Sequence, residues 1–324
     1  MTTKQGDAQR QWHDVDAVQR LVLSFLGPMD LVRMSSLNRS FHRSARHSPR
    51  LNLSSDINME LGCTGYDRLV PYFRHARVLD VCMSFALPDE LLHLTSFRHL
   101  EDVSLVDVAS LSDYHLSALT CHAMHLKRLR VDGCHELVSP SLHLAHATTL
   151  DVSNNLHLQR LPIHGRAGFL TELRVSSCPA FVAFNTIMAA APNVQTADFA
   201  QSNGLVRFHC RRAWLHLRSL VLVRCAQLAM LEVEAPTLTS IRVDLCVRLE
   251  AIVLSTDSLP TANFSLLPAL QSLYLDCPRL TRLNVTGSTA LQPSGVMLEC
   301  PLLTSKKFQR DGVPSLVDIL RQND

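Results

Sequence analysis

A twelve-residue pattern recurs along the sequence and constrains the fold more than any other feature. The clearest copy is LRSLVLVRCAQL at 217–228, which reads L-x-x-L-x-L-x-x-C-x-x-L. Three further copies, at 126–137, 170–181 and 238–249, fit the same pattern. Including the looser copies, the fourth position is occupied by Leu79, Val103, Leu129, Leu150, Leu173, Ala197, Leu220, Ile241 and Leu273. Such regular recurrence indicates stacked structural units rather than one globular core.

The spacing of these marker residues identifies the type of repeat. Successive markers are 24, 26, 21, 23, 24, 23, 21 and 32 residues apart, and all but the last interval fall in the range of leucine-rich repeats. In L-x-L the two apolar residues of a short strand point inward, and the residue between them points outward. We therefore predict an α/β leucine-rich-repeat solenoid of about nine to ten coils, with parallel strands about 4.8 Å apart on its concave face.

The return path of each coil is predicted from a second apolar motif, eleven residues after the marker. Two segments, 111–125 and 181–192, instead have helical apolar spacing and predict a helix on the convex side. The solenoid should therefore be α/β in its early coils and increasingly ββ toward residue 290. Extended return segments are expected at 158–163, 205–210, 228–233, 249–254 and 280–285.

The ninth position of the pattern is expected to point into the turn beside backbone groups. We interpret its side chains as buried and structural rather than metal-binding or redox-active. The ten cysteines are expected to be reduced, because the polar N-terminal residues lack the apolar centre of a secretory signal. The ninth-position residues are Cys134, Asn155, Cys178, Cys225, Cys246 and, in a copy one residue short, Cys277.

The outward residues of the strands form the candidate partner-binding surface. Successive rungs alternate Arg and Asp, which fits a charge-compensated ladder or, alternatively, a polar strip that recognises a partner protein. Val221, Val223 and Leu245 interrupt the polar rungs and form a candidate apolar hot spot. The predicted concave-face residues are Arg130, Asp151, Arg174, Asp198, Val221, Val223, Arg242 and Tyr274.

The residues before the repeats have a different, helical periodicity. Apolar residues form one stripe over 15–26, the pair Gly27-Pro28 breaks it, and a second stripe runs over 31–41. Asp30 lies where an acidic residue favours the start of the second helix. Residues 14–50 therefore look like a compact helical hairpin or trio.

This segment resembles the F-box motif. The resemblance rests on Val18-x-x-x-Val22-x-Ser24-Phe25-Leu26-x-Pro28-x-Asp30-Leu31, followed by Met34, Leu37, Arg39 and Phe41. It implies docking on the Skp-type adaptor of a cullin–RING ubiquitin ligase, with a protein substrate held by the repeats. One departure is Asp14-Val15, where family members usually open with Leu-Pro. The adaptor-facing positions implied are Val15, Val18, Val22, Leu26, Pro28, Leu31 and Met34.

Two functions remain open. The first is a non-catalytic substrate-recognition subunit of a Skp–cullin–F-box ubiquitin ligase. The second is a leucine-rich-repeat scaffold whose N-terminal helices only cap the solenoid. The expected organisation is a disordered segment at 1–13, an F-box-like domain at 14–50, the solenoid at 51–305 and a C-terminal cap or tail at 306–324.

Two segments need separate interpretation. LPDELLHLTSF at 87–97 begins like an F-box, but we interpret it as the helix of the first coil because Leu87 already fills position twelve of a repeat. The apolar side at 313–320 predicts a helix that caps the last coil, with a partner-binding helix as the alternative.

Enzyme chemistry is not indicated. The sequence has no phosphate loop, nucleophile elbow, HExxH helix or dinucleotide fingerprint. The group Cys121, His122, His125, Cys134 and His135 lacks any CxxC pair with zinc spacing, so no metal or other cofactor is expected. A net charge of +2 gives no reason to expect nucleic acid or a membrane as partner. A cytoplasmic or nuclear location is expected.

Overall fold

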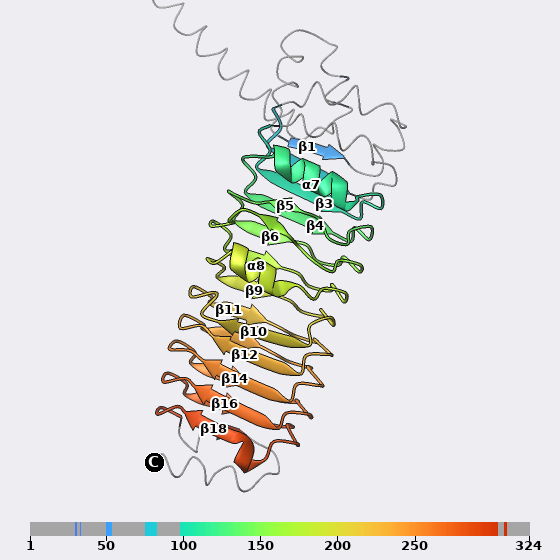
Figure 1. The fold of residues 1–324 in the computed structure, drawn as a ribbon. Coiled ribbons are helices and arrows are strands. Elements are labelled where there is room, and N and C mark those ends of the chain that lie inside the picture. The colour runs from blue at the N-terminus through green and yellow to red at the C-terminus, as the bar shows by residue number, and fades with distance from the viewer. Residues whose placement is uncertain are drawn as a thin grey trace, which may run out of the picture.

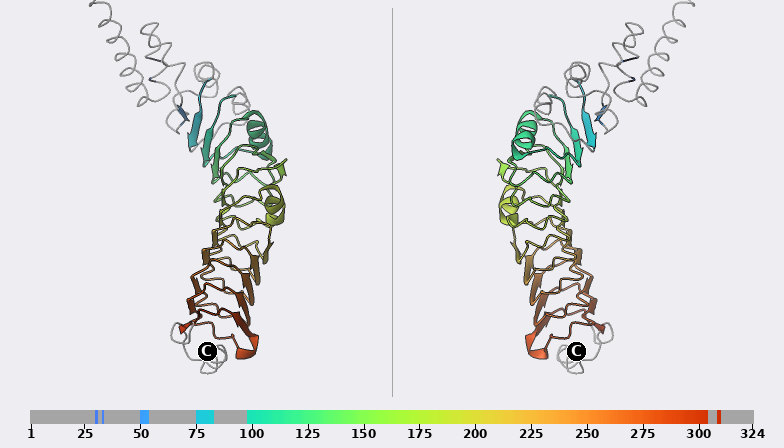
Figure 2. Two further views of the ribbon diagram at one scale, coloured as in Figure 1. Left: turned by 90° about the vertical axis from the view of Figure 1, so that its left-hand side faces the viewer. Right: turned by 90° about the vertical axis from the view of Figure 1, so that its right-hand side faces the viewer.

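The computed structural model describes residues 30, 33, 50–53, 75–82, 98–303 and 308–309, with backbone only at 51–53 and 308–309. Residues 50–53, 75–82 and 98–303 form a single elongated stack of coils that curves along its length (Figures 1 and 2). The expected helices at 87–97 and 313–320 lie outside the described residues, as does the segment at 1–13.

The inner side of the curve is a nine-stranded parallel sheet. Its strands follow the order β1-β2-β3-β4-β6-β8-β9-β11-β13. The markers lie in register, with Leu79 opposite Val103 and Leu129 opposite Leu150. The predicted leucine-rich-repeat solenoid is thereby confirmed. The strands are β1 (Arg50–Leu53), β2 (Val78–Cys82), β3 (Asp102–Val106), β4 (Arg128–Asp132), β6 (Thr149–Asp151), β8 (Glu172–Arg174), β9 (Thr196–Asp198), β11 (Ser219–Val221) and β13 (Ser240–Arg242).

The outer side changes along the chain from helices to strands. Helices α7 (Asp113–His122) and α8 (Phe184–Ala190) lie on the convex side of the early coils (Figure 2). A two-stranded sheet, β5 (Leu142–His143) and β7 (Ile163–His164), lies between them in sequence. The predicted change from α/β to ββ coils is confirmed. The later coils carry a five-stranded parallel sheet of β10 (Arg207–Arg211), β12 (Met230–Glu234), β14 (Ala251–Ser255), β16 (Ser272–Asp276) and β18 (Val296–Glu299), with a short 3-10 turn, η3 (Pro293–Gly295), before β18.

The last inner strands correct one part of the predicted register. The inner row continues from Ile241 to Ala262 in β15 (Thr261–Asn263) and Leu283 in β17 (Arg282–Asn284), at steps of 21 residues. These strands form a separate three-stranded sheet with β19 (Phe308–Gln309). Leu273 is therefore not an inner marker, because it lies in β16 of the outer sheet. The expectation of a return strand at 280–285 is wrong for the same reason.

The physical cause of this slip is that the late coils have two similar halves. Inner and outer strands both follow L-x-x-L-x-L, and their markers alternate at 10 or 11 residues from Leu220 through Leu231, Ile241 and Ile252. A shift by half a coil therefore leaves the apolar pattern almost unchanged. Only the 32-residue interval, which is one full coil of 21 plus a half coil of 11, marks the shift.

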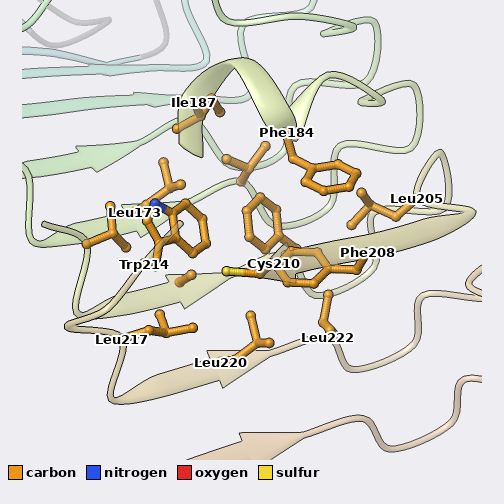
Figure 3. Close-up of a cluster of buried hydrophobic side chains, with 14 of the residues drawn as sticks. Leu173, Phe184, Ile187, Leu205, Phe208, Cys210, Trp214, Leu217, Leu220 and Leu222 are labelled. Atoms are coloured by element: carbon orange, nitrogen blue, oxygen red, sulfur yellow. The ribbon is translucent and has the colours of Figure 1, made fainter. Parts of the chain in front are cut away.

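The core is a continuous column of inward side chains that gains aromatic rings where helices give way to strands. Phe184 of α8 stacks on Phe208 of β10 with ring centroids 5.1 Å apart (Figure 3). The ring centroids of Phe199 and Trp214 are 6.4 Å apart. Trp214 is fully buried, and its indole Nε1 donates a hydrogen bond of 2.9 Å to the carbonyl oxygen of Ala191. The aromatic rings thus fill the space between α8 and the first strand of the outer sheet.

The ninth-position side chains tie each turn to the coil before it. Cys178 Sγ lies 3.1 Å from the carbonyl oxygen of Val152, and Ser202 Oγ donates to that of Val175 at 2.6 Å. Burial raises the pKa of Cys134 and Cys178 to about 12, so both thiols stay protonated at neutral pH. The predicted buried, structural role of this position is confirmed. The sequence reasoning missed Ser202 and Ser288, because it looked for Cys or Asn.

Cys277 needs a separate correction. Its Sγ lies 3.9 Å from the carbonyl oxygen of Leu254, in the turn after an outer strand. It therefore belongs with Cys300, whose Sγ lies 3.6 Å from the carbonyl oxygen of Leu275, rather than with the inner turns. In the outer turns, as in the inner ones, a buried cysteine thiol thus lies against a backbone carbonyl oxygen of the preceding coil.

Candidate protein-interaction surface

Most of the predicted partner-binding residues lie on the inner sheet. Register places Arg130 opposite Asp151 and Arg174 opposite Asp198, while Val221 lies between Asp198 and Arg242. Val223 follows in the turn after β11. The six strand residues therefore form one row across β4 to β13, at the outward position that the repeat predicts.

The two arginines of this row that form ion pairs do so with residues of their own coil, although Arg128 of β4 pairs with Asp102 of β3 elsewhere on the inner sheet. Arg130 pairs with Asp132 at 2.7 Å, and Arg242 pairs with Asp244 at 3.3 Å. The hydrogen bond that Arg130 donates to Asp132 is the main cause that raises the pKa of Arg130. Asp151 accepts hydrogen bonds from the Ser153 backbone N–H and hydroxyl. Among the described residues, no ion pair within 4 Å joins neighbours in the row, so charges alternate without closing into a bonded ladder.

Arg174 differs from the other arginines of the row. It is exposed at the end of β8, between Asp151 of β6 and Asp198 of β9. Within the described part of the chain, its guanidinium makes no ion pair. An exposed guanidinium of this kind can pair with a carboxylate of a bound protein.

The apolar residues of the inner face form a larger group than the sequence suggested. Besides the half-buried Val221 and Val223 and the exposed Leu245, this part of the chain has two more exposed apolar residues, Val247 and Leu266. We call these five residues the turn patch, since most of them lie in the turns after β11, β13 and β15. Leu266 was missed because its coil was not recognised in the sequence; the long marker interval was the available signal.

Tyr274 lies elsewhere than predicted. It is on β16 of the outer sheet, where its hydroxyl donates a hydrogen bond of 3.0 Å to Glu299 Oε1. That hydrogen bond to a carboxylate is the main cause that raises the pKa of Tyr274. Its neighbour in register on β18 is the exposed Met297. Tyr274 is therefore not part of the inner face.

Several histidines immediately precede the first residue of a coil, next to the start of the inner strands. His75, His99 and His125 each precede the first residue of a coil, with ring centroids 5.8 and 6.4 Å apart along the stack. His146 stacks on Phe169 at 5.9 Å in the coils that follow. In the described residues there is no group of three or more His, Cys, Asp or Glu side chains that could hold a metal ion. The nine described cysteines are free thiols.

The predicted adaptor-facing residues cannot be placed on this surface. Val15, Val18, Val22, Leu26, Pro28, Leu31 and Met34 all lie outside the described residues. Within the helical segment, Asp30 and Arg33 are described; both are helical, and their side chains form an ion pair of 3.3 Å. No helix in the described part of the chain is long and apolar enough to span a membrane.

Comparison with known proteins adds one family. Residues 16–53 match the F-box domain. Among solved structures, the yeast Rad7–Elc1 complex matches with 13% identity and a TM-score of 0.32, covering 97% of each chain. The TLR13–ssRNA13 complex matches with 13% identity and a TM-score of 0.25, covering 83% of this chain and 54% of the other. Both likenesses are too remote to support an argument about function.

No curated protein matches the sequence. The F-box match ends inside β1, whose four residues pair in register with β2 from Arg50 opposite Val78 to Leu53 opposite Val81. The chain thus carries an F-box domain match at residues 16–53 that leads directly into a leucine-rich-repeat solenoid.

Proposed function

We propose that this chain is a non-catalytic substrate-recognition subunit of a cullin–RING, Skp–cullin–F-box type, ubiquitin ligase. The observation that carries the proposal is the F-box match immediately before the solenoid. The F-box segment would dock on a Skp-type adaptor, and the inner face would bind a target protein. Ubiquitin transfer would be performed by other subunits, in the cytoplasm or the nucleus.

The junction between the two parts supports this division of labour. Residues 50–53 belong both to the F-box match and to β1, which is the first strand of the inner sheet. Parallel pairing fixes this strand against β2. A target held on the sheet would therefore have a defined orientation relative to the end of the F-box segment, as a substrate receptor requires.

The inner face supports the binding half of the proposal. It presents an exposed guanidinium at Arg174 and an apolar group, the turn patch, that begins two coils away. Protein interfaces commonly combine a buried apolar centre with arginine contacts. In this proposal Arg130, Asp151, Arg174, Asp198, Val221, Val223 and Arg242 would contact the target.

A second candidate function rests on the same junction. β1 covers the edge of β2, which would otherwise expose unpaired backbone groups at the first coil. A segment whose only task is to cap a solenoid would place a strand in the same way. In that case the chain is a protein-interaction scaffold without an adaptor.

Adaptor binding separates the two candidates. The full chain, a Leu31→Ala, Met34→Ala variant and a control Val206→Ala, Met297→Ala variant are each tested for capture of a purified Skp-type adaptor. Circular dichroism first verifies that all three keep their β content. The substrate-receptor proposal expects binding by the wild type and the control, with at least tenfold weaker binding by the Leu31→Ala, Met34→Ala variant.

A fourth variant interprets a negative result. Asp14→Leu, Val15→Pro restores the Leu-Pro opening that is usual in F-boxes. If the wild type fails to bind and this variant binds, the F-box is degenerate in its first turn. If neither binds, the substrate-receptor proposal is wrong and the scaffold remains.

A further inference from the structure

The turn after each inner strand contains one residue in the left-handed backbone conformation. This holds in nine successive coils, from the turn after β3 to the turn after β17. Glycine, asparagine and aspartate tolerate this conformation best, and leucine is poorly suited to it. The nine residues are Asp107, Gly133, Asn154, Ser177, Gln201, Arg224, Leu245, Leu266 and Gly287.

Two adjacent coils place a leucine at this position. Leu245 has φ 63° and Leu266 has φ 56°. Their relative exposures are 43% and 60%, so neither contributes much to the core. These leucines are therefore unfavourable locally and gain little from burial within the chain. Exposed apolar residues held in a strained backbone are typical of binding sites.

Backbone hydrogen bonds hold Leu266 directly and hold Asp244, the residue before Leu245. The backbone N–H of Leu266 donates to the carbonyl oxygen of Thr286 at 2.7 Å, and that of Arg224 donates to Asp244 at 2.8 Å. Gly287 leaves room for the Leu266 side chain, because a Cβ there would lie 2.8 Å from Leu266 Cδ2. A preorganised surface of this kind loses little entropy when a partner binds.

The charges around the turn patch are mainly positive. The inner strands and turns at 219–228, 240–249 and 261–268 contain Arg224, Arg242, Arg248 and the acid Asp244, and Asp198 lies beside Val221 on β9. Asp244 pairs with Arg242, while Arg248 donates a hydrogen bond to the neutral Gln227. Arg224 is exposed and makes no ion pair within the described residues. The charge complement of this site is therefore an acidic partner.

We propose that the turn patch binds a short extended segment of the target protein in which two aliphatic side chains stand beside carboxylates. The aliphatic side chains would contact Leu245, Leu266 and Val223, and the carboxylates would pair with Arg224 and Arg248. Adjacent coils are about 4.8 Å apart, so two leucines on successive coils offer two neighbouring contacts along one peptide. The identification of this segment as part of a ubiquitination target rests on the proposed function.

Three pools of fluorescein-labelled twelve-residue peptides test the chemistry. The first has a fixed core of acid–Leu–any residue–Leu–acid, the second replaces the acids by lysine, and the third replaces the leucines by serine. Fluorescence anisotropy with the full chain should give at least tenfold tighter binding of the acidic leucine pool than of either other pool. Binding of that pool should weaken as salt is raised. Equal binding of the acidic leucine and serine pools would overturn the proposal.

A double variant distinguishes a binding role from a structural one. Leu245→Asn, Leu266→Asn should weaken binding of the acidic leucine pool at least tenfold, while the urea midpoint of unfolding stays equal or rises because asparagine tolerates the left-handed conformation. The matched control is Val182→Ser, Val206→Ser, which removes two valines with exposures of 54% and 53% elsewhere on the solenoid. This control should bind the pool as the wild type does. A lower urea midpoint with unchanged peptide binding would show that the leucines are structural.

The adaptor assay keeps this inference separate from the proposed function. Peptide binding that disappears in the Leu245→Asn, Leu266→Asn variant, together with no adaptor binding by any variant, would support the site and reject the ligase. Adaptor binding without selective peptide binding would support the ligase and reject the site.

Discussion

At the scale of single residues, Asn155 shows how one buried side chain connects neighbouring coils. Its amide Nδ2 donates to the carbonyl oxygens of Val131 at 2.9 Å and Val152 at 2.7 Å. Its Oδ1 accepts a hydrogen bond of 2.8 Å from the backbone N–H of Cys134. Asn155 has no exposed surface, so every one of these partners depends on it rather than on solvent.

Replacing Asn155 should therefore be costly. Asn155→Ala leaves three buried backbone groups without this partner and should lower the free energy of unfolding by about 2–4 kcal/mol. Urea unfolding followed by circular dichroism measures the loss. Asn155→Cys, which introduces the residue found at this position in neighbouring coils, should lose less because its thiol keeps one contact. A loss under about 0.5 kcal/mol for the alanine variant would contradict the bridging role.

The buried thiols give a second residue-scale prediction. Burial raises the pKa of Cys178 to about 12 and that of Cys210 to about 11, so both are protonated at pH 8. Cys121, on α7, is exposed. Iodoacetamide at pH 8 should therefore modify Cys121 in the folded protein and leave Cys178 and Cys210 unmodified, as peptide mass spectrometry can measure.

Urea provides the control for this labelling. In the unfolded protein all three cysteines should react at similar rates, since their environments become alike. Modification of Cys178 in the folded protein as fast as that of Cys121 would show that the coil around it opens readily.

At the scale of elements, Trp214 fixes the C-terminal end of α8. Trp214→Phe removes the indole hydrogen bond to Ala191 and leaves space in the aromatic cluster, so we expect a loss of about 2–4 kcal/mol in unfolding free energy. Hydrogen exchange at 184–191 should accelerate more than elsewhere. The control is Phe264→Leu in a coil far along the chain from α8, which should destabilise its own coil without accelerating exchange at 184–191. Equal exchange of α8 in both variants would contradict the anchoring role.

Glu101 gives a pH prediction for the connections between early coils. It accepts a hydrogen bond of 2.7 Å from Lys127 and pairs with Arg77 at 3.5 Å. The Lys127 hydrogen bond is the largest cause that lowers the pKa of Glu101. A carboxyl whose pKa is lowered by folding stabilises the protein above its unfolded pKa of about 4.3, and that stabilisation is lost as pH falls through the folded pKa.

The measurement compares urea midpoints at pH 7 and pH 3. Glu101→Gln should have a lower midpoint than the wild type at pH 7, and this difference should shrink at pH 3. Glu250→Gln is the control, because Glu250 forms no ion pair in the described part of the chain, and it should match the wild type at both values. A midpoint difference for Glu101→Gln that is as large at pH 3 as at pH 7 would assign the effect to the shape of the side chain rather than to its charge.

The sequence predicted the strands and helices better than it predicted whether a given strand lies in the inner or the outer sheet. Repeat spacing was sufficient for the solenoid, and changed apolar spacing was sufficient for α7 and α8. It could not assign Leu273 and Leu283 to opposite sheets, since each half coil carries the same pattern. Tyr274 was misplaced as a direct result. The sequence could not predict the ion-pair partners either. Register places Arg130 opposite Asp151, but the flexible side chain of Arg130 pairs with Asp132 on the same strand.

At the scale of the whole molecule, each coil contacts mainly its neighbours. The loss of stability caused by a core substitution should therefore remain confined to the substituted coil and the coils next to it. Leu173→Ala removes a fully inward side chain of β8 and should cost about 2–5 kcal/mol. Hydrogen exchange followed by mass spectrometry should show faster exchange in β6, β8 and β9, with β14 and β16 unchanged. Leu275→Ala, in β16, should give the mirror result. Uniform acceleration in all coils would instead indicate that the solenoid opens as one unit.

The regular spacing of strands in the inner sheet also means that the number of coils sets the distance between two points along the solenoid. Seven strand-to-strand steps separate β1, where the F-box match ends, from β11, which carries Val221, the first residue of the turn patch. At about 4.8 Å a step, the turn patch begins about 34 Å along the stack from that end. Removing one whole coil between them would bring the patch about 5 Å nearer without altering its side chains, so the number of coils sets the reach of whatever the patch holds.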